Sequence, residues 1–218
     1  MTDPAGAALR VTEIFHSLQG ESTRAGLPTV FVRLTGCPLR CVWCDTEYAF
    51  AGGEPLTVAE ILGRVLAYRC AVVCVTGGEP LAQKACPALL EAFCDAGLSV
   101  SLETGGALDI APVDPRVSRI VDLKAPDSGE VGRNRWENLA LLTPRDELKL
   151  VLASRADYEW ACDAVRRHAL DSRCPVLFSP VHGRLDPRQL AEWILEDHVP
   201  VRFQVQLHKL LWGSERAR

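Results

Sequence analysis

The amino-acid sequence predicts an α/β protein built on a sheet of parallel strands with helices packed outside it. Short runs rich in β-branched and apolar residues alternate with helical patterns almost from one end of the 218-residue chain to the other, which is typical of repeated strand–helix units. Several runs are apolar at nearly every position, as expected for strands covered on both faces. Because the chain shows no repeats, charge runs or linker composition, residues 1–218 are predicted to form one domain.

Eight segments are predicted as strands: Val11–His16, Thr29–Thr35, Ala71–Thr76, Leu98–Glu103, Arg119–Lys124, Glu147–Leu152, Pro175–Ser179 and Val201–Leu207. Helices are predicted between them. One begins at Thr57, where Thr57 and Glu60 have the spacing of a capping box. Another begins at Asp186, which is a suitable N-cap before a proline at the first helical position. The remaining helices are predicted at Leu81–Ala96, Arg155–Ala169 and, as a short piece, near Trp136–Leu142.

Composition and charge exclude several classes of protein. The chain is 48% hydrophobic and 24% charged, with a net charge of −4, so no direct nucleic-acid partner is expected, since phosphate neutralisation needs a basic face. No apolar run reaches the roughly 18 residues of a membrane span, and the first ten residues lack the layout of a signal peptide. We therefore expect a cytoplasmic protein with no membrane partner. In that reducing compartment, nine cysteines more often bind metal or react than form disulfides.

Chemically distinctive residues follow the predicted strands at the points where each strand ends. They are Cys37, Gly77, Gly78, Glu79, Glu103, Thr104, Lys124, Ser179 and His208. The carboxyl ends of parallel strands share one edge of the sheet, and ligand sites of such sheets lie at that edge. The sequence therefore predicts a single site assembled from several loops, although loops are also polar for no functional reason.

Three thiols, Cys37, Cys41 and Cys44, lie within eight residues in the spacing Cys-x3-Cys-x2-Cys. One loop with this spacing can wrap a soft metal centre with thiolates. A structural zinc needs four closed ligands, whereas an iron–sulfur cubane held by three cysteines leaves one iron open. Spacing alone does not name the metal, so zinc, a cluster and simple burial all stay open. The other six cysteines lie on apolar patterns and are interpreted as small buried hydrophobes: Cys70, Cys74, Cys86, Cys94, Cys162 and Cys174.

Together with the downstream turn Thr76-Gly77-Gly78-Glu79-Pro80, the thiol loop resembles the radical S-adenosylmethionine (SAM) superfamily. The resemblance implies that the three cysteines hold a 4Fe-4S cluster whose open iron chelates the amino and carboxylate groups of SAM. It also implies one-electron cleavage of SAM to a 5′-deoxyadenosyl radical, chemistry that belongs to the cofactor while the protein orients it. The glycines would let the backbone approach the methionine end of SAM, and Glu79 would accept from its ammonium group.

Four flanking segments resemble the 7-carboxy-7-deazaguanine synthase family more narrowly: His16–Ser22, Phe31–Leu34, Cys44–Thr46 and Gln206–Lys209. The resemblance spans most of the chain and implies a homodimer on an incomplete TIM-like barrel, which suits 218 residues better than the roughly 250 of a full barrel. It implies a lyase that converts 6-carboxy-5,6,7,8-tetrahydropterin to 7-carboxy-7-deazaguanine. Ammonia is lost after abstraction of the C6 hydrogen and ring contraction. Such a reaction belongs to the route to queuosine, a modified tRNA base, or another deazapurine, and needs an electron donor such as flavodoxin or ferredoxin.

Carried over residue by residue, the resemblance implies three sites and no catalytic side chain, because the radical chemistry belongs to the cofactor. The SAM site would contain Trp43, Cys44, Asp45, Gly78, Glu79, Asp122, Leu123, Lys124, Ser179, Pro180, Val181 and His182. The substrate site would contain Leu18, Gln19, Gly20, Glu21, Arg33, Thr76 and His208. Thr46 matches a position whose hydroxyl ligates Mg²⁺, a hard ion that would take its other oxygens from substrate and water. The polar tail 214–218 departs from the family pattern, in which the substrate lies near the end of the chain.

Two other functions stay open at the level of sequence. A glycyl-radical-enzyme activating protein shares the thiol loop and the small size, although Gln19-Gly20-Glu21 before the loop favours the deazaguanine reaction. A non-enzymatic zinc-binding module would use the same loop with a fourth ligand such as Cys74 or His16. The acidic net charge and the clustering at strand ends argue against the zinc module.

Overall fold

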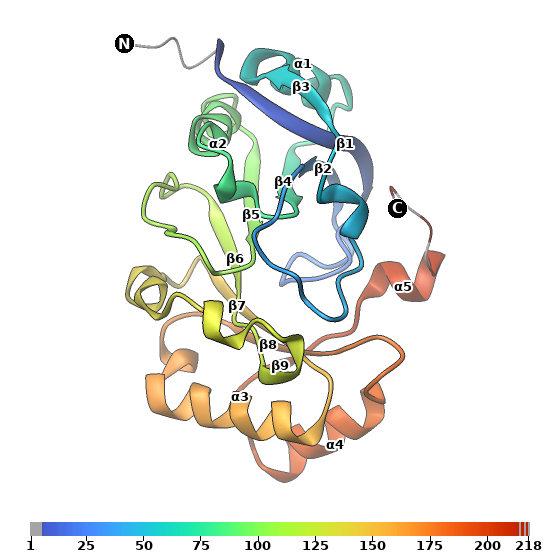
Figure 1. Ribbon diagram of the computed structural model, residues 1–218, viewed down its shortest axis with the longest axis vertical. Coiled ribbons are helices and arrows are strands. Elements are labelled where there is room, and N and C mark those ends of the chain that lie inside the picture. The colour runs from blue at the N-terminus through green and yellow to red at the C-terminus, as the bar shows by residue number, and fades with distance from the viewer. Residues whose placement is uncertain (1–5, 214, 216, 218) are drawn as a thin grey trace.

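In the computed structural model, which describes residues 6–213, 215 and 217, nine strands form one open sheet in the order β3-β1-β2-β4-β5-β6-β7-β8-β9 (Figure 1). From β2 to β9 every neighbouring pair is parallel, which confirms the predicted α/β fold and incomplete barrel. The strands are β1 Ala8–Leu18, β2 Pro28–Leu34, β3 Glu54–Thr57, β4 Val72–Gly77, β5 Ser99–Thr104, β6 Ser118–Asp122, β7 Glu147–Leu152, β8 Val176–Pro180 and β9 Arg202–Phe203.

The β1 end of the sheet corrects the expectation of parallel strands throughout. β1 pairs antiparallel with β2 on one side and with β3 on the other, and it is longer than the predicted Val11–His16. β3 was not predicted, because its four residues include Pro55 and read as a turn. Proline is tolerated there because β3 is an edge strand, where an absent N–H leaves no central ladder bond unmade.

The helices are α1 Val58–Ala67, α2 Cys86–Asp95, α3 Arg155–His168, α4 Pro187–Glu196 and α5 Leu207–Trp212, with 3-10 turns η2 Glu47–Ala49, η3 Pro80–Ala82, η4 Pro126–Ser128, η5 Val131–Arg133, η6 Trp136–Leu141 and η7 Leu170–Ser172. The capping box of α1 is confirmed, since Thr57 Oγ1 accepts from Glu60 N at 3.2 Å and Thr57 N donates to Glu60 Oε2 at 2.8 Å. The cap of α4 is also confirmed, since Asp186 Oδ1 accepts from Arg188 N at 2.9 Å. No helix of the described residues is long and apolar enough to cross a membrane.

Three predicted elements differ in detail. Leu81–Ala96 is not one helix, because the Gln83 side chain bonds the carbonyls of Arg10 and Thr35 and holds the chain extended between η3 and α2. The piece near Trp136–Leu142 is a 3-10 helix rather than an α-helix. Val201–Leu207 is strand only at Arg202–Phe203, after which the chain leaves the sheet and begins α5 at Leu207.

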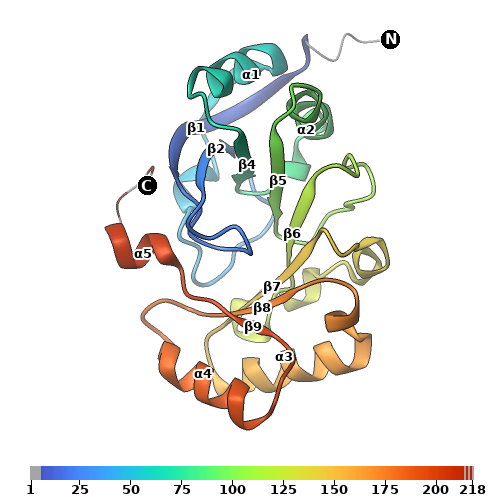
Figure 2. The same ribbon diagram turned by 180° about the vertical axis from the view of Figure 1, so that it is seen from behind.

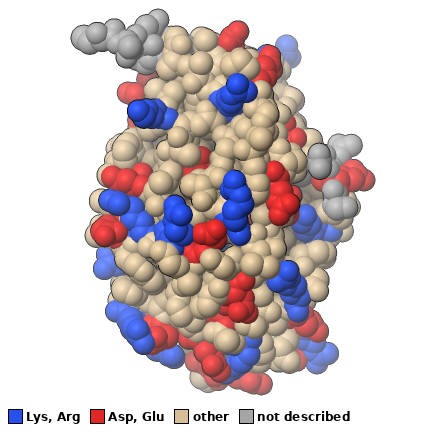
Figure 3. Space-filling view, viewed as in Figure 1, with Lys and Arg blue, Asp and Glu red and all other residues tan. Residues whose placement is uncertain are grey.

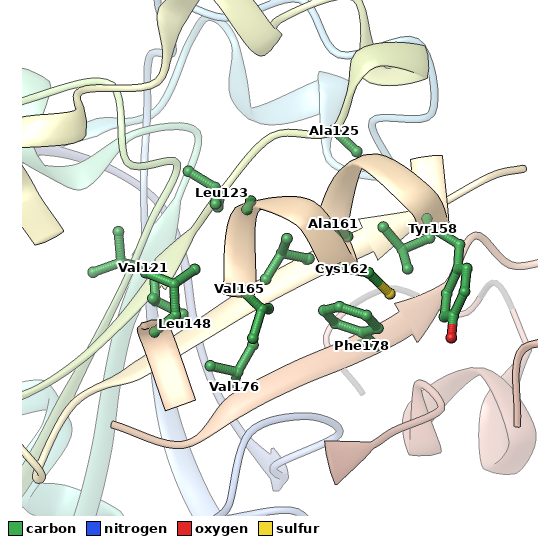
Figure 4. Close-up of a cluster of buried hydrophobic side chains, with 14 of the residues drawn as sticks. Val121, Leu123, Ala125, Leu148, Tyr158, Ala161, Cys162, Val165, Val176 and Phe178 are labelled. Carbon is green, nitrogen blue, oxygen red and sulfur yellow. The ribbon is translucent and has the colours of Figure 1, made fainter. Parts of the chain in front are cut away.

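Two apolar layers lie on the outer face of the curved sheet. In Figures 1 and 2, α1 and α2 cover the β1–β5 half, and α3 and α4 cover the β6–β9 half. Figure 4 shows the second layer, where Tyr158 and Phe178 meet edge to face with ring centroids 6.2 Å apart. Cys74, Cys86, Cys162 and Cys174 are buried as predicted, whereas Cys70 and Cys94 are only partly buried.

The inner face of the sheet differs from the outer one. Its apolar content is a small cluster of Phe15, Phe31 and Cys74, and the rest of the enclosed space holds buried polar side chains such as Gln19, Glu21 and Thr76. Burying polar groups is costly unless they are paired. Their concentration inside the barrel therefore indicates where the functional site lies.

Candidate active site

The thiol loop leaves the end of β2 and returns to the protein at η2, crossing the middle of the molecule in Figure 1. Gly36 N donates to Ala49 O at 2.8 Å and Val42 N donates to Ser128 O at 3.0 Å, so both sides of the loop are fixed. Cys37, Cys41 and Cys44 on this loop are free and partly exposed. The loop therefore holds three accessible thiols in a defined backbone.

The glycine turn after β4 packs directly on this loop. Glu79 N donates to Gly36 O at 2.8 Å, and Gly78 N donates to Leu34 O at 3.1 Å. A Cβ atom at Gly78 would lie 2.2 Å from Gly36 O and 2.9 Å from Cys37 Cβ, so this position accepts no side chain without displacement of the loop. The two strongest sequence motifs therefore form one unit at the carboxyl edge of the sheet.

Glu79 is fully buried beneath this turn. Its carboxylate accepts from Leu81 N at 3.0 Å, from Gly105 N at 2.7 Å and from the Thr104 hydroxyl at 2.9 Å. Burial raises the pKa of Glu79, while these donors oppose the rise. In this structure Glu79 thus fixes the turn after β5 to the turn after β4.

The thiol loop fits a three-thiolate metal cluster by its donor set. Among the described residues no three His, Cys, Asp or Glu side chains are already gathered around one point, so a cluster would draw the thiols together within their loop. Burial raises the pKa of Cys37 and of Cys41, and the nearby Lys124 ammonium acts on both in the opposite direction. A cation beside partly exposed thiols favours the thiolate form that metals require.

A buried ionic network lies beside the loop. Lys124 Nζ is 2.6 Å from Asp122 Oδ2, and Lys149 Nζ is 2.7 Å from Glu21 Oε2 and 3.5 Å from Asp122 Oδ1. Burial alone would raise the pKa of Asp122 and of Glu21, but the ammonium groups hold both below their usual values. The four side chains are therefore charged, and they join the segment after β1, the end of β6 and the middle of β7.

Substrate candidates from the N-terminal part of the chain meet β4 and β5 inside the barrel. Gln19 Nε2 donates to Glu103 Oε1 at 3.1 Å, and the Thr76 hydroxyl donates to Glu103 Oε2 at 2.8 Å. His208 packs on Gly20, where a Cβ would lie 2.1 Å from His208 Nδ1. Burial lowers the pKa of His208, which favours its neutral form. Leu18 lies at the end of β1, next to this group.

Arg33 is held by two neighbours on its own side of the barrel. Its Nε donates to Glu13 Oε1 at 2.6 Å, and the Tyr48 hydroxyl donates to the same oxygen at 2.9 Å. The guanidinium carbon lies 5.7 Å from the Phe15 ring centroid and 5.9 Å from that of Tyr48. Because the Nε–H group of Arg33 is bonded to Glu13, the two terminal nitrogens of the guanidinium are the groups available to bind a ligand.

The remaining SAM candidates lie around the same edge. A small pocket is lined by Trp43, Asp122, Leu123, Lys124 and Lys149. Trp43 also lies 5.8 Å from the Arg184 guanidinium, which follows the turn Pro180–His182. Ser179 Oγ is buried and has no hydrogen-bond partner among the described residues, which points to a partner that a ligand would supply. Val181 is buried, while His182 lies on the surface.

Asp45 and Thr46 lie where the thiol loop ends. Asp45 Oδ2 is 3.6 Å from Lys209 Nζ in α5, and Thr46 Oγ1 is 3.7 Å from Cys44 Sγ. The structure therefore brings the candidate Mg²⁺ ligand next to a candidate cluster ligand. On the face shown in Figure 3, acidic and basic side chains are interspersed rather than separated into fields of one sign.

A cavity of about 440 Å³ lies at the opposite edge of the sheet, lined by Asp171, Arg173, Cys174, Pro175 and Arg202 among others. These residues surround the amino ends of β8 and β9, far along the strands from the thiol loop. The sequence assigned no role to this cavity. Its lining holds none of the candidate site residues.

Four residues organise the site beyond the roles that the sequence assigned. Glu13 and Lys149 were not singled out, whereas Glu103 was expected at the carboxyl edge of the sheet and Gln206 lies in a family-like segment, neither of them with a stated partner. A usable signal was present for Lys149, because it is a charged residue between Leu148 and Leu150 in a strand. Such residues are almost never buried unless paired. Glu13 could be found only from the strand register, and the partner of Gln206 only from the path of the chain.

Comparisons with known proteins agree with this geometry. The family model of the radical SAM superfamily matches residues 31–172. A 7-carboxy-7-deazaguanine synthase of Chlorobaculum tepidum is 50% identical over 212 residues, covering 96% of each chain. One of Koribacter versatilis is 44% identical over 222 residues, covering 95% of this chain and 98% of that protein.

Solved structures show a similar fold. The crystal structure of QueE from Escherichia coli matches with a TM-score of 0.77 at 22% identity, covering 92% of this chain and 95% of that one. Streptococcus suis SuiB bound to its precursor peptide SuiA matches with a TM-score of 0.57 at 15% identity, covering 78% of this chain and 46% of that one. At these identities the likeness is one of fold.

Proposed function

Because this chain belongs to the 7-carboxy-7-deazaguanine synthase family of the radical SAM superfamily, we propose that it converts 6-carboxy-5,6,7,8-tetrahydropterin to 7-carboxy-7-deazaguanine with loss of ammonia. The observation that carries the proposal is the packing of the Gly78 turn on the Cys37 loop at the mouth of a polar barrel. The product would serve the biosynthesis of queuosine or another deazapurine. The whole chain would act as one cytoplasmic radical SAM domain.

Cys37, Cys41 and Cys44 would hold the 4Fe-4S cluster, with SAM on its open iron. When bound, this pair supplies a carbon-centred radical that removes hydrogen from the substrate. The protein's part is to orient SAM against the substrate. The backbone at Gly78 allows close approach, the Ser179 hydroxyl offers an unpartnered polar atom, and Trp43 with Asp122–Lys124 lines a pocket beside the loop.

The substrate would lie inside the barrel among Gln19, Arg33, Thr76 and Glu103. A pterin edge presents several donors and acceptors, and the Gln19–Glu103–Thr76 group can exchange its internal hydrogen bonds for bonds to such an edge. The Arg33 fork suits the carboxylate. Leu18, Gly20, Glu21 and His208 would close this side, and Thr46 would ligate an Mg²⁺ that bridges protein and carboxylate.

Two further parts of the proposal concern partners. The active form would be a homodimer, and electrons would come from a donor such as flavodoxin or ferredoxin. Leu210 and Leu211 in α5 are 67% and 50% exposed, so this helix offers apolar surface next to the site.

The test is anaerobic reconstitution with iron and sulfide, followed by addition of SAM, a chemical reductant, Mg²⁺ and 6-carboxy-tetrahydropterin, with products followed by mass spectrometry. We expect 7-carboxy-7-deazaguanine together with 5′-deoxyadenosine. Formation of 5′-deoxyadenosine alone would keep the radical chemistry and reject the substrate. Neither product from protein that holds its cluster would favour an activating enzyme that acts on a protein partner.

A further inference from the structure

Lys149 contacts two parts of the proposed site that lie far apart in the sequence, the SAM segment 122–124 and the substrate segment 18–21. Its ammonium contacts Glu21 at 2.7 Å and Asp122 at 3.5 Å, and its carbonyl oxygen accepts from Leu123 N at 2.9 Å. The side chain is 12% exposed. Backbone and side chain of this one residue therefore hold the SAM segment 122–124, while the side chain also holds the end of the substrate segment 18–21.

The contacts continue from Glu21 to the segment before α5. Glu21 Oε1 accepts from Gln206 Nε2 at 2.8 Å, and Leu207 N donates to Gly20 O at 2.9 Å. Ser22 exchanges two hydrogen bonds of 2.7 Å with the Gln204 amide. The segment near residue 206 is thus linked to Glu21 and its neighbours, and Glu21 and Asp122 both contact Lys149.

The charges of this network are shared rather than paired one to one. The Asp122 carboxylate contacts two ammonium groups, that of Lys124 at 2.6 Å and that of Lys149 at 3.5 Å. The Lys149 ammonium in turn contacts two carboxylates, those of Asp122 and Glu21. In a buried setting such interactions are strong and influence one another. A ligand that binds against Asp122 or Lys124 therefore changes how firmly Lys149 holds Glu21.

We propose that Lys149 is a positioning residue that transmits SAM binding at 122–124 to the substrate segment 18–22 and to the segment 204–208. The inference rests on the proposed placement of SAM. Its consequence is that the substrate side of the barrel becomes ordered when SAM is present. Coupling between two sites typically changes each ligand's affinity 5- to 150-fold, and it is reciprocal.

The test measures amide hydrogen exchange by mass spectrometry on the cluster-loaded protein without reductant, with and without SAM. In the wild type we expect SAM to slow exchange in peptides that contain 18–22 and 204–208, by at least about fivefold, as well as in 122–124. Lys149→Met keeps an unbranched side chain, one heavy atom shorter, and removes the charge. In this variant we expect protection of 122–124 alone.

Two further variants separate positioning from folding. Lys149→Arg retains the charge and should restore part of the remote protection. Arg119→Lys alters a buried ion pair on the same two strands and should keep the wild-type pattern. If Lys149→Met does not fold, Glu21→Gln, which keeps the shape but not the charge, takes its place with the same expected loss.

Two results would overturn the inference: no remote protection by SAM in the wild type, or the wild-type pattern in the variant that lacks the charge. Neither depends on the pterin. Remote protection in a wild-type protein that forms no 7-carboxy-7-deazaguanine would reject the proposed substrate and keep the role of Lys149.

Discussion

Two buried ion pairs involve β6 and β7, one at the amino ends of these strands and one toward their carboxyl ends, and they organise the molecule differently. At the amino end, Arg119 is bound to Asp146 through Nε at 3.0 Å and Nη2 at 2.6 Å. Asp146 also accepts from the backbone and hydroxyl of Thr143. At the carboxyl end, Lys149 is shared between Asp122 and Glu21. In the first pair, one guanidinium binds both oxygens of one carboxylate. In the second, one ammonium is shared between two carboxylates.

The partners also differ in their distance along the chain. Arg119 and Asp146 are 27 residues apart, and they fix the connection between neighbouring strands. Lys149 and Glu21 are 128 residues apart, and together with the contacts of Thr23 to Glu147 they connect β7 to the segment that follows β1. A complete local pair stabilises the fold, while a divided long-range pair is available to respond to a ligand. The substitutions below test this distinction.

The largest contrast is expected from one thiol at each end of the sheet. Cys41→Ala removes a proposed cluster ligand, so iron content and product formation should fall to the background, because two thiolates do not retain a cubane. Cys174→Ala, at the opposite edge, should retain both and lose only about 1 kcal/mol of unfolding free energy. Iron analysis measures the cluster content of both variants, and urea denaturation measures their unfolding free energy. Full iron content in Cys41→Ala would refute the ligand assignment.

Arg119→Met should lower the unfolding free energy by about 3–5 kcal/mol, because it leaves the Asp146 carboxylate buried without its partner. Urea denaturation measures this loss. Iron content and SAM affinity per folded molecule should be unchanged, since the pair lies away from the thiol loop. A loss of SAM affinity larger than in Lys149→Met would reverse the distinction between the two pairs.

The loss of unfolding free energy at acidic pH should depend on Asp146. Burial alone would raise the pKa of Asp146, but its hydrogen bonds from Arg119 and Thr143 hold it below the ordinary value of 3.8. A depressed carboxyl pKa gives stability that is present above the ordinary pKa and is lost as the pH falls through the lower folded value. Asp146→Asn should therefore show a smaller difference in unfolding free energy between about pH 6 and about pH 3. An unchanged difference would contradict the assignment.

The smallest effect is expected at a hydroxyl. Thr46→Ala should reduce the Mg²⁺ dependence of turnover a few-fold while SAM affinity is retained, and Thr46→Ser should behave as the wild type. Thr143→Ala removes a hydroxyl at the other edge that donates to Asp146 at 2.9 Å, and should cost about 1 kcal/mol of stability with an unchanged Mg²⁺ response. Turnover measured across a Mg²⁺ titration tests whether Thr46 ligates the ion. The same response in Thr46→Ala and the wild type would remove Thr46 from the magnesium site.

Most of the sheet could be predicted from sequence because its strands are covered on both faces and so are uniformly apolar. The exceptions have specific causes. Val201, Phe203, Val205 and Leu207 alternate like a strand, but the bonds from Gln204 and Gln206 to Ser22 and Glu21 draw the chain off the sheet into α5. Long-range contacts of this kind override local pattern.

The candidate site also has parts that could be predicted from sequence and parts that could not. The thiol loop and the glycine turn are contiguous motifs, so their chemistry and their proximity followed from the sequence. The role of Lys149 and the partners of Glu103 required the register and the chain path that place them beside Asp122 and Gln19. The tail residues 214, 216 and 218, whose relation to the substrate was an expectation, lie outside the described residues.

The contact between Ser22 and Gln204 spans 182 positions, nearly the length of the chain. Closing so long a loop carries a large entropic cost and is repaid only when the intervening strands have formed. During synthesis, the segment that completes the barrel interior leaves the ribosome after all nine strands. Segment 204–208 should therefore dock against the interior of the barrel only after the strands have paired.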